Sequence, residues 1–295
     1  MSKIIITGGA GFIGSNLVDE LVARGDEVHV IDNLSGGKQE NLNPAAVFHK
    51  EDVANFSAIR PLFDGAEYVF HLAALPLVQY SIEHPIETNE VNVGGTLNVL
   101  TAAKEAGVKK VVYSASSAAY GDQAIMPLVE EMPAKPKSPY GLQKYIGEMY
   151  CRIFSEIYNL PTVCLRYFNV YGPRQNEEGA YALVIGKFLK QKREGLSLTI
   201  TGDGTQTRDF VSVHDVARAN ILAMEKEVGG GEVFNIGAGQ NYSVNEVAKM
   251  IGGEVEYIPA RLEPYVSRAD NRKAREVLGW TPTVSLAEGL KELTS

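Results

Sequence analysis

The chain has 295 residues, enough to bury a large core, and its net charge of -8 argues against nucleic acid or an anionic membrane as the main partner. Its two cysteines and five histidines show no spacing typical of a metal site or a disulfide framework, so we expect buried thiols and no metal. No apolar run is long enough to cross a membrane, and no basic and apolar leader precedes the first apolar run. We therefore expect a cytoplasmic protein.

Short apolar runs alternate with amphipathic stretches through the first half of the chain. Runs rich in valine, isoleucine and leucine predict buried strands at residues 3–7, 27–31, 68–72, 110–114 and 162–166. Between them, apolar residues three and four apart predict helices within residues 15–24, 93–106 and 140–158. Buried strands that alternate with helices form a parallel sheet covered on both faces. We predict an α/β fold with a doubly wound parallel sheet of the Rossmann type.

After about residue 170 the predicted segments become shorter and turns become more frequent. We predict a larger sheet domain over residues 1–169, to which part of residues 208–237 returns. A smaller mixed α/β domain would then comprise residues 170–207 and 238–295. Its last segment predicts two short helices around a turn at Trp280–Pro282.

A glycine-rich turn, KIIITGGAGFIG, joins the first predicted strand to the first predicted helix, and Gly8, Gly11 and Gly14 stand three apart. Without Cβ atoms the loop can approach a pyrophosphate closely, and the start of the helix supplies oriented N–H groups. The alternative is a tight turn that merely joins the two elements. The strand–turn–helix context favours a dinucleotide-binding loop.

The second predicted strand ends in VIDN, which places Asp32 eighteen residues after Gly14. A carboxylate there accepts both ribose hydroxyls and repels a 2′-phosphate, so the sequence favours NAD over NADP. Asp52 and Val53 follow a third strand, where they can hold the adenine amino group, and residues 71–75 lie near the expected cofactor path, with packing as the alternative role. The NAD site that we predict contains Gly8, Gly11, Phe12, Ile13, Gly14, Asp32, Asn33, Asp52, Val53, Leu72, Ala73, Ala74, Asn92, Ser114, Tyr140, Lys144 and Tyr167.

The segment SASSAAYG, residues 114–121, ends an apolar strand with hydroxyl groups and has no acid, histidine or cysteine. After the next loop, Ser138 can cap a helix on which Tyr140 and Lys144 share a face. A nearby ammonium and the positive nicotinamide ring lower the pKa of a phenol, so Tyr140 can act as a base. Ser116 can hydrogen-bond the oxygen that loses its proton. A Tyr–Lys pair on a helix surface is the alternative.

The motifs TGGAGFIG, VIDN, SASSAAYG, YGLQK and LRYFNVYGPR together resemble the extended short-chain dehydrogenase/reductase superfamily, and within it the NAD-dependent nucleotide-sugar epimerases. The resemblance covers essentially the whole chain. It implies that Tyr140 is the catalytic base and that Lys144 is its electrostatic partner and binds the nicotinamide ribose. It assigns the hydroxyl donor to Ser116, with Ser117 as the close rival.

The absence of acidic residues from SASSAAYG limits which of the family's reactions this chain is expected to catalyse. The superfamily's sugar 4,6-dehydratases carry acids at the positions that match Ser117 and Ala118, and its decarboxylases carry a glutamate at the position of Ala118. The GDP-fucose-forming enzyme has a cysteine at the position of Ala118. Ala118 can neither donate nor accept a proton, so the reactions that need an acid there are excluded. Of the reactions that the resemblance implies, oxidation followed by reduction at a single carbon remains. We predict that Tyr140 takes the O4 proton of a UDP-hexose while the C4 hydride passes to NAD. The 4-keto sugar then turns over, and the hydride returns to its other face.

A sugar that turns over needs a fixed nucleotide, and the resemblance supplies candidate anchors. It implies that Asn169 binds the phosphates of the sugar nucleotide and that Tyr167 approaches the nicotinamide. Arg208 falls in a segment similar to the family's diphosphate-binding stretch, and an ion pair with Asp203 or Asp209 is its alternative role. Leu198 and Ile200 are expected along the nucleotide base.

Two segments match the family only loosely. Thr201 stands where relatives usually have an aromatic residue, so it is open whether a side chain stacks on the nucleotide base here. In the second segment, Arg261 is the candidate for the second phosphate-binding arginine. Ser267 falls where a bulky tyrosine limits some relatives to hexoses without an N-acetyl group. Because serine opens that side, we expect UDP-GlcNAc and UDP-GalNAc to be accepted beside UDP-glucose and UDP-galactose.

Two other functions stay open at this point. One is a related single-carbon reaction on a different nucleotide sugar, including a reductase that releases NADH. The other is a non-catalytic NAD-binding sensor, against which the intact Ser116, Tyr140 and Lys144 speak. By analogy with similar enzymes, the helices at residues 90–106 and 140–158 are expected to form a homodimer interface.

Overall fold

A computed structural model describes residues 2–177, 183–259 and 266–294. Within these residues, seven parallel strands form the main sheet in the order β11-β6-β5-β4-β1-β2-β3. The strands are β1 (Lys3–Thr7), β2 (Glu27–Ile31), β3 (Val47–His49), β4 (Tyr68–His71), β5 (Lys110–Ser116), β6 (Thr162–Tyr167) and β11 (Glu232–Ile236). Because the strand order reverses beside β1, the carboxyl ends of β1, β2 and β4 meet at a crevice where a ligand can bind.

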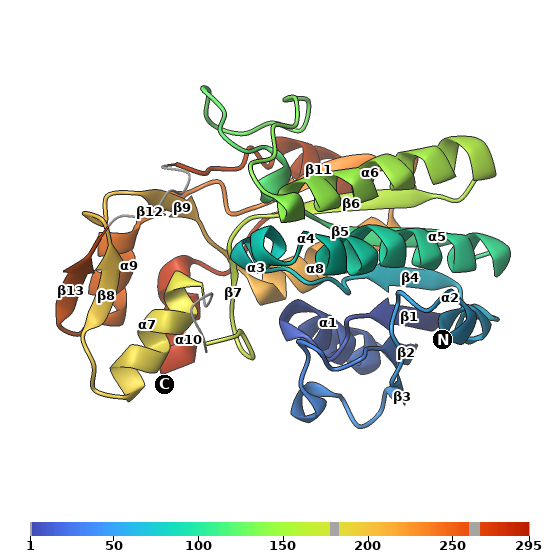
Figure 1. The fold of residues 1–295 in the computed structure, drawn as a ribbon, viewed down its shortest axis with the longest axis horizontal. Helices are drawn as coiled ribbons and strands as arrows, with labels where there is room; N and C mark the ends of the chain where they lie inside the picture. The colour runs from blue at the N-terminus through green and yellow to red at the C-terminus, as the bar shows by residue number, and fades with distance from the viewer. Residues whose placement is uncertain (1, 178–182, 260–265, 295) are drawn as a thin grey trace.

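Helices cover both faces of this sheet, so the fold has three layers (Figure 1). One face carries α1 (Phe12–Ala23), α8 (Val213–Glu225) and the short helix η5 (Ala274–Leu278). The opposite face carries α2 (Phe56–Ile59), η2 (Arg60–Phe63), α5 (Thr96–Glu105) and α6 (Pro139–Tyr158). The predicted doubly wound α/β fold is confirmed.

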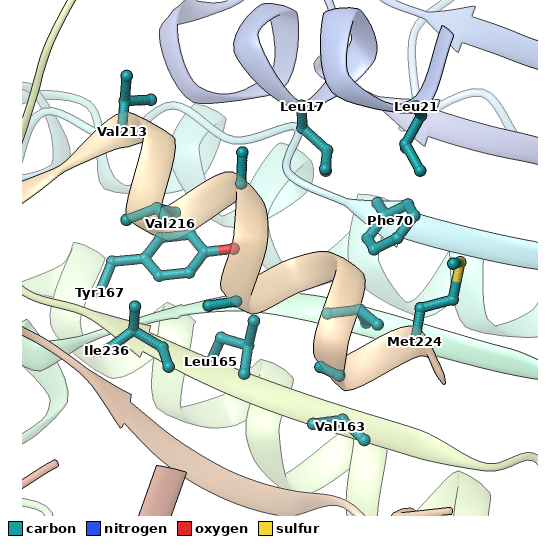
Figure 2. Packing of buried hydrophobic residues seen from close by; sticks show 14 of the residues in the cluster. Leu17, Leu21, Phe70, Val163, Leu165, Tyr167, Val213, Val216, Met224 and Ile236 are labelled. Carbon is teal, nitrogen blue, oxygen red and sulfur yellow. The ribbon is translucent and has the colours of Figure 1, made fainter. Parts of the chain in front are cut away.

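Helix α8 lies beside α1 on the same face of the sheet, and it is apolar both toward the sheet and toward α1 (Figure 2). Val163, Leu165 and Ile236 of the sheet lie along one side of it, and Leu17 and Leu21 of α1 lie along the other. A segment that follows residue 207 in the chain therefore completes the core on this face of the sheet, over β5 and β6.

A smaller unit stands at one end of the molecule, on the left in Figure 1. Three two-stranded sheets belong to this region or to its junction with the main sheet: β7 (Val170–Tyr171) with β10 (Val211–Ser212), β8 (Leu198–Thr201) with β13 (Val255–Ile258), and β9 (Thr207–Asp209) with β12 (Asn241–Ser243). Its helices are α7 (Val184–Arg193), α9 (Val244–Ile251) and α10 (Leu286–Thr294), which share an apolar core with β8.

Shorter helices complete the connections around the main sheet. They are η1 (Gln39–Asn41), α3 (Val78–Glu83), α4 (Pro85–Asn89), η3 (Glu90–Gly95) and η4 (Ser117–Ala119). Within the described part of the chain, none of the helices has the length and apolar character needed to span a membrane.

The five predicted strands agree with the structure to within two residues. Residues 3–7 and 27–31 have the predicted bounds, β4 ends one residue earlier, β5 extends two residues further and β6 extends one. The two short helices expected near Trp280 are η5 and α10, and the Trp280 indole donates a 2.8 Å hydrogen bond to the carbonyl of Asp215.

Candidate active site

The glycine-rich turn between β1 and α1 packs so tightly that side chains cannot fit at two of its positions. Gly8 has a φ of +75°, and a Cβ on it would lie 2.6 Å from the nitrogen of Ala73. A Cβ on Gly14 would lie 2.2 Å from the carbonyl oxygen of Gly8. Helix α1 starts after Gly11 without a side-chain cap, so no side chain occupies the N–H groups of its first turn. This cradle fits the pyrophosphate of a dinucleotide.

Asp32, at the end of β2, faces the same turn. It is 8% exposed, and its carboxylate accepts hydrogen bonds from the backbone N–H groups of Ala10, at 3.0 Å, and Leu34, at 2.8 Å. Asn33 donates a 2.9 Å hydrogen bond to Asp52, so the ends of β2 and β3 are joined there. The structure thus brings Asp32, Asn33 and Asp52 to one side of the glycine turn, which suits an adenosine ribose.

Several other predicted cofactor residues have structural roles. The Val53 side chain is 4% exposed and packs in the core under α5. Asn92 is 2% exposed, and its amide pairs with both backbone groups of Leu75, at 2.8 and 3.1 Å, and donates to the Gln143 side chain, at 2.8 Å. Asn92 therefore fixes the loop after β4 against α6, as the packing alternative stated.

His71, the first residue of the segment 71–75 expected near the cofactor path, is buried and supports this loop. His71 Nδ1 lies 2.7 Å from the Thr7 hydroxyl, and its Nε2 lies 2.9 Å from the Thr96 hydroxyl. Thr96 donates to the carbonyl of Asn92, so its oxygen accepts a hydrogen bond from a protonated Nε2 of His71. Burial lowers the pKa of His71 to about 3, and the charge of Lys144 adds to this effect.

Helix α6 begins as its sequence predicts. The Ser138 side chain accepts a 3.1 Å hydrogen bond from the N–H of Gly141, and Pro139 occupies the first turn. The N–H of Tyr140 donates to the Ser81 hydroxyl at 3.1 Å, which ties the helix start to α3. This start aims the first turn of α6 at the end of β5.

The Tyr140 phenol is partly buried and lies beside the Ser116 side chain at the end of β5, close enough for Ser116 to lower the pKa of Tyr140. The structure thus pairs Tyr140 with Ser116 rather than with Ser117. Burial raises the pKa of Tyr140, and Ser116 opposes that rise. The sequence analysis expected a lowered pKa; in the chain itself the loss of solvation outweighs the effect of the Ser116 side chain.

Lys144 lies one turn further along α6 and is 3% exposed. Its ammonium donates a 2.8 Å hydrogen bond to the carbonyl of Ser114 and lies 5.1 Å from the centre of the Tyr113 ring. Burial lowers the pKa of Lys144 to about 8. The structure therefore holds an ammonium on the same helix face as Tyr140, at the cofactor side of the sheet.

Tyr167, at the end of β6, is 7% exposed, and its hydroxyl donates to the Asn220 side chain at 2.9 Å. Burial raises the pKa of Tyr167, and the Asn220 and Ser114 side chains oppose that rise. Sequence reasoning missed Asn220, because nothing in the local sequence relates α8 to the end of β6.

The predicted substrate residues converge in part. The Asn169 amide donates to the carbonyl of Asp209 at 2.9 Å and to the Ser267 hydroxyl at 3.3 Å, so these distant segments meet. Both carboxylate oxygens of Asp209 accept backbone N–H groups of residues 238, 239 and 269. Arg208 is half-buried on β9 and donates to the carbonyl of Thr207 at 2.9 Å.

Leu198 and Ile200 differ from the expectation. They are 0% and 1% exposed and pack in the core of the smaller unit, while Thr199 and Thr201 alternate with them on the other side of β8. Their side chains therefore have no exposed surface for a nucleotide base, and any contact from this strand falls to its backbone or to the threonines. Arg261 lies outside the described residues.

Ala118 stands beside the hydroxyl pair. Its N–H donates to the Ser116 oxygen at 3.2 Å, and a Cβ on Gly141 would lie 2.7 Å from its carbonyl, so Ala118 touches the start of α6. Tyr140, Ser116 and Lys144 can therefore move one proton to or from a hydroxyl, with no acid on residue 118. Among the described residues, no three His, Cys, Asp or Glu side chains gather as a metal site would require.

Comparisons with known proteins agree with this geometry. Residues 4–237 match the NAD dependent epimerase/dehydratase family. A UDP-glucose 4-epimerase of Mycolicibacterium smegmatis is 41% identical, over 98% of this chain and 96% of that protein. The crystal structure of a UDP-glucose 4-epimerase with UDP-glucose from Thermotoga maritima has a TM-score of 0.95 and 44% identity, covering 99% of this chain and 97% of that one.

A second solved structure is equally similar in fold. It is a UDP-N-acetylglucosamine 4-epimerase from Methanobrevibacter ruminantium in complex with UDP-N-acetylmuramic acid, with a TM-score of 0.95 and 38% identity, covering 99% of this chain and 97% of that one. Relatives of similar identity thus carry names with different sugars. The match to the family model and the extent of these similarities show that this chain belongs to the NAD dependent epimerase/dehydratase family and that its cofactor is NAD.

Proposed function

We propose that this chain interconverts the C4 epimers of a UDP-hexose and retains its NAD through the reaction. The observation that carries the proposal is the placement of Ser116 beside Tyr140, next to an alanine at residue 118. A hydroxyl pair without a second acid suits the removal and return of one proton and gives no means of expelling water or a carboxylate.

In this proposal each residue of the site has one task. Tyr140 removes the O4 proton of the sugar and later returns a proton to O4 after the sugar has turned over. Ser116 holds the same oxygen, and Lys144 favours the phenolate form of Tyr140 through its charge. Bound NAD supplies a reversible hydride acceptor.

The binding residues follow from the same proposal. The glycine turn and the start of α1 hold the NAD pyrophosphate, and Asp32 holds the adenosine ribose. Asn169 and Arg208 are proposed anchors for the substrate diphosphate, with Arg261 as a further candidate. The convergence of Asn169, Asp209 and Ser267 supports a substrate site at the junction between the main sheet and the smaller unit.

We further propose that N-acetylated sugars are accepted. Ser267 contacts Asn169 and has a short side chain, which leaves room where a larger residue would exclude an acetamido group. Ser267→Tyr is expected to lose turnover of UDP-GlcNAc and UDP-GalNAc by at least about tenfold and to keep turnover of UDP-glucose and UDP-galactose. Ser267→Ala is the control that keeps the space open.

The function is tested by incubating the NAD-loaded protein with each of the four UDP-sugars and separating the products. The proposal expects interconversion of C4 epimers without net release of NADH. Net NADH release would identify a reductase, and NAD binding without turnover of any of the four sugars would favour the sensor; either result contradicts the proposal.

The chain is also proposed to form a homodimer through α4, η3, α5 and α6. On α6, Leu142, Ile153 and Ile157 are 47%, 42% and 65% exposed, and Ile86 of α4 is 77% exposed. Such a stripe of exposed apolar side chains is typical of an interface. Ile157→Glu should convert a dimer to a monomer in analytical ultracentrifugation, while Ile125→Glu, at an equally exposed residue outside these helices, should not. A wild-type monomer would contradict this proposal.

A further inference from the structure

Lys144 carries its charge in an unusual setting. It is 3% exposed, and its ammonium donates to a neutral carbonyl, that of Ser114, and lies over the Tyr113 ring. An ammonium buried in this way loses hydration that a carbonyl and an aromatic ring replace only in part. A nearby negative charge is needed to keep it protonated.

The negative charge lies one turn further along the same helix. Glu148 is separated from Lys144 by four residues on α6, so the two side chains share a face, and Glu148 is 1% exposed. Its carboxylate accepts two hydrogen bonds from Arg166 of β6, at 2.8 and 2.7 Å. Arg166 is itself 3% exposed and lies 4.4 Å from the centre of the Tyr120 ring.

The buried Glu148–Arg166 pair is costly to maintain for stability alone. Two buried charges lose much hydration, and a well-packed apolar pair at the same place is often as stable. The two parallel hydrogen bonds fix the carboxylate in one orientation on the face that carries Lys144 and Tyr140. The site therefore contains a carboxylate that Arg166 balances in charge and holds in one orientation on the helix face of Lys144.

We propose that Glu148, held by Arg166, is a positioning residue that keeps Lys144 protonated beside Tyr140. The inference rests on the proposed function, in which Lys144 must carry its charge while Tyr140 acts as the base. Glu148 acts through Lys144 and does not contact the substrate.

The direction of the ionisation effects supports this role. Burial lowers the pKa of Lys144 to about 8, and ionised Cys151 and Glu148 oppose that fall. Burial raises the pKa of Glu148, while Arg166 and Lys144 lower it. A carboxylate with two guanidinium hydrogen bonds stays ionised near neutral pH, whereas a thiol is charged only once it has lost its proton.

The other titratable groups around Lys144 do not supply the charge. They are His71 of β4, Tyr113 of β5, Cys164 of β6, and Tyr140 and Cys151 of α6. Burial keeps His71 neutral, and it raises the pKa of Tyr113 and of Cys164 well above the ordinary values. Cys151 is thus the group that must be separated from Glu148 by experiment.

The test compares three variants of the NAD-loaded protein: Glu148→Gln, Cys151→Ser, and the double variant Glu148→Gln/Arg166→Gln. Two quantities are followed with pH. One is the alkaline limb of kcat, and the other is the NMR titration of the Lys144 side chain in protein with isotope-labelled lysine, assigned with Lys144→Arg. Thermal unfolding is measured for each variant.

Glu148→Gln is expected to lower both the Lys144 titration midpoint and the alkaline limb by about one pH unit. Cys151→Ser should move neither of them. The double variant removes the unpaired buried guanidinium, so it should regain thermal stability and yet keep a smaller shift in the same direction, because Glu148 and not Arg166 acts on Lys144. It also provides the test if Glu148→Gln alone fails to fold.

Three results would overturn the proposal: an unchanged Lys144 titration when Glu148 is replaced, an equal shift in Cys151→Ser, or a double variant that regains the wild-type titration together with its stability. The last result would mean that the pair is merely structural. If the wild-type protein turns over none of the UDP-sugars, the proposed function fails, and the Lys144 titration still decides the role of Glu148.

Discussion

The backbone N–H of Ala10 donates a 3.0 Å hydrogen bond to the carboxylate of Asp32, so the glycine turn and the end of β2 are held together by one side chain. The second oxygen of Asp32 accepts the N–H of Leu34 at 2.8 Å. The same carboxylate thus shapes the loop and stands where a ribose would bind, which makes Asp32 sensitive to replacement in two ways.

Asp32→Asn is expected to raise the Kd for NAD about tenfold or more, because it removes a charge-assisted acceptor and leaves an amide N–H against a backbone N–H. The affinity for NADP should fall less, since a neutral side chain no longer repels the 2′-phosphate. Calorimetric titration of stripped protein with both dinucleotides measures the two constants. Asp64→Asn, at an exposed carboxylate, is the control, and an unchanged ratio in Asp32→Asn would refute the assignment.

Gly14→Ala should lower the free energy of unfolding by about 2–3 kcal/mol, because the new Cβ would lie 2.2 Å from the carbonyl oxygen of Gly8. The loop must shift to relieve this contact, so the amount of NAD that copurifies should fall as well. Gly36→Ala is a matched control in the next loop, where a Cβ has no neighbour within 4 Å. Chemical denaturation and the NAD content of purified protein are the measurements, and equal behaviour of the two variants would contradict the prediction.

Tyr140→Phe is expected to reduce kcat by about 10²- to 10⁴-fold, and Ser116→Ala by about 10- to 100-fold, with little change in melting temperature. Because the two side chains interact, their effects should not add in the double variant. Steady-state kinetics of the wild-type protein, the two single variants and the double variant test whether the two residues act together. Strict additivity would mean that Ser116 acts independently of Tyr140.

The neutral His71 makes the fold sensitive to acid. The pKa of His71 in the folded chain is about 3, below its ordinary value of 6.5, so the unfolded chain binds a proton first as the pH falls. Stability is therefore complete above pH 6.5 and is lost between pH 6.5 and pH 3. From this group alone the free energy of unfolding should fall by about 2 kcal/mol between about pH 7.5 and about pH 5.

The contribution of His71 is isolated by comparing variants. His71→Gln should be less stable at neutral pH, because the bridge between Thr7 and Thr96 is disturbed, and its stability should depend less on pH in this range. His84→Gln, at an exposed histidine, should keep the wild-type slope. Urea denaturation at several pH values measures the slopes, and a wild-type slope in His71→Gln would disprove the explanation.

The sequence predicts the elements of the main sheet well, because their patterns are local. Alternation of apolar runs with amphipathic stretches locates β1 and β2 to the residue, and Ser138 followed by Pro139 marks the start of α6. Tyr140 and Ser116 are brought together as expected, since the ends of β5 and α6 are neighbours in this topology.

Residues that depend on distant contacts are predicted less well. The Asn92 amide could hydrogen-bond a ligand, yet in the structure it is already hydrogen-bonded to Leu75 and Gln143. Leu198 and Ile200 were expected along the nucleotide base, but they pack in the apolar core of the smaller unit, which the family resemblance does not predict. Glu148 could have been found, because its spacing from Lys144 is that of one helical turn; Arg166, its partner, is recognisable only from the pairing of β5 with β6.

The position of α8 and β11 limits how relatives of this protein can exchange parts. Both elements follow the first strands of the smaller unit in the chain, yet α8 packs beside α1 on the main sheet and β11 forms an outer edge of that sheet. A recombination that replaces everything after Asn169 would bring a foreign helix against Leu17 and Leu21. Replacing the whole C-terminal part of the chain to change substrate preference would therefore disturb the core of the NAD-binding domain. Only chimeras that keep residues 213–236 of this chain preserve that core.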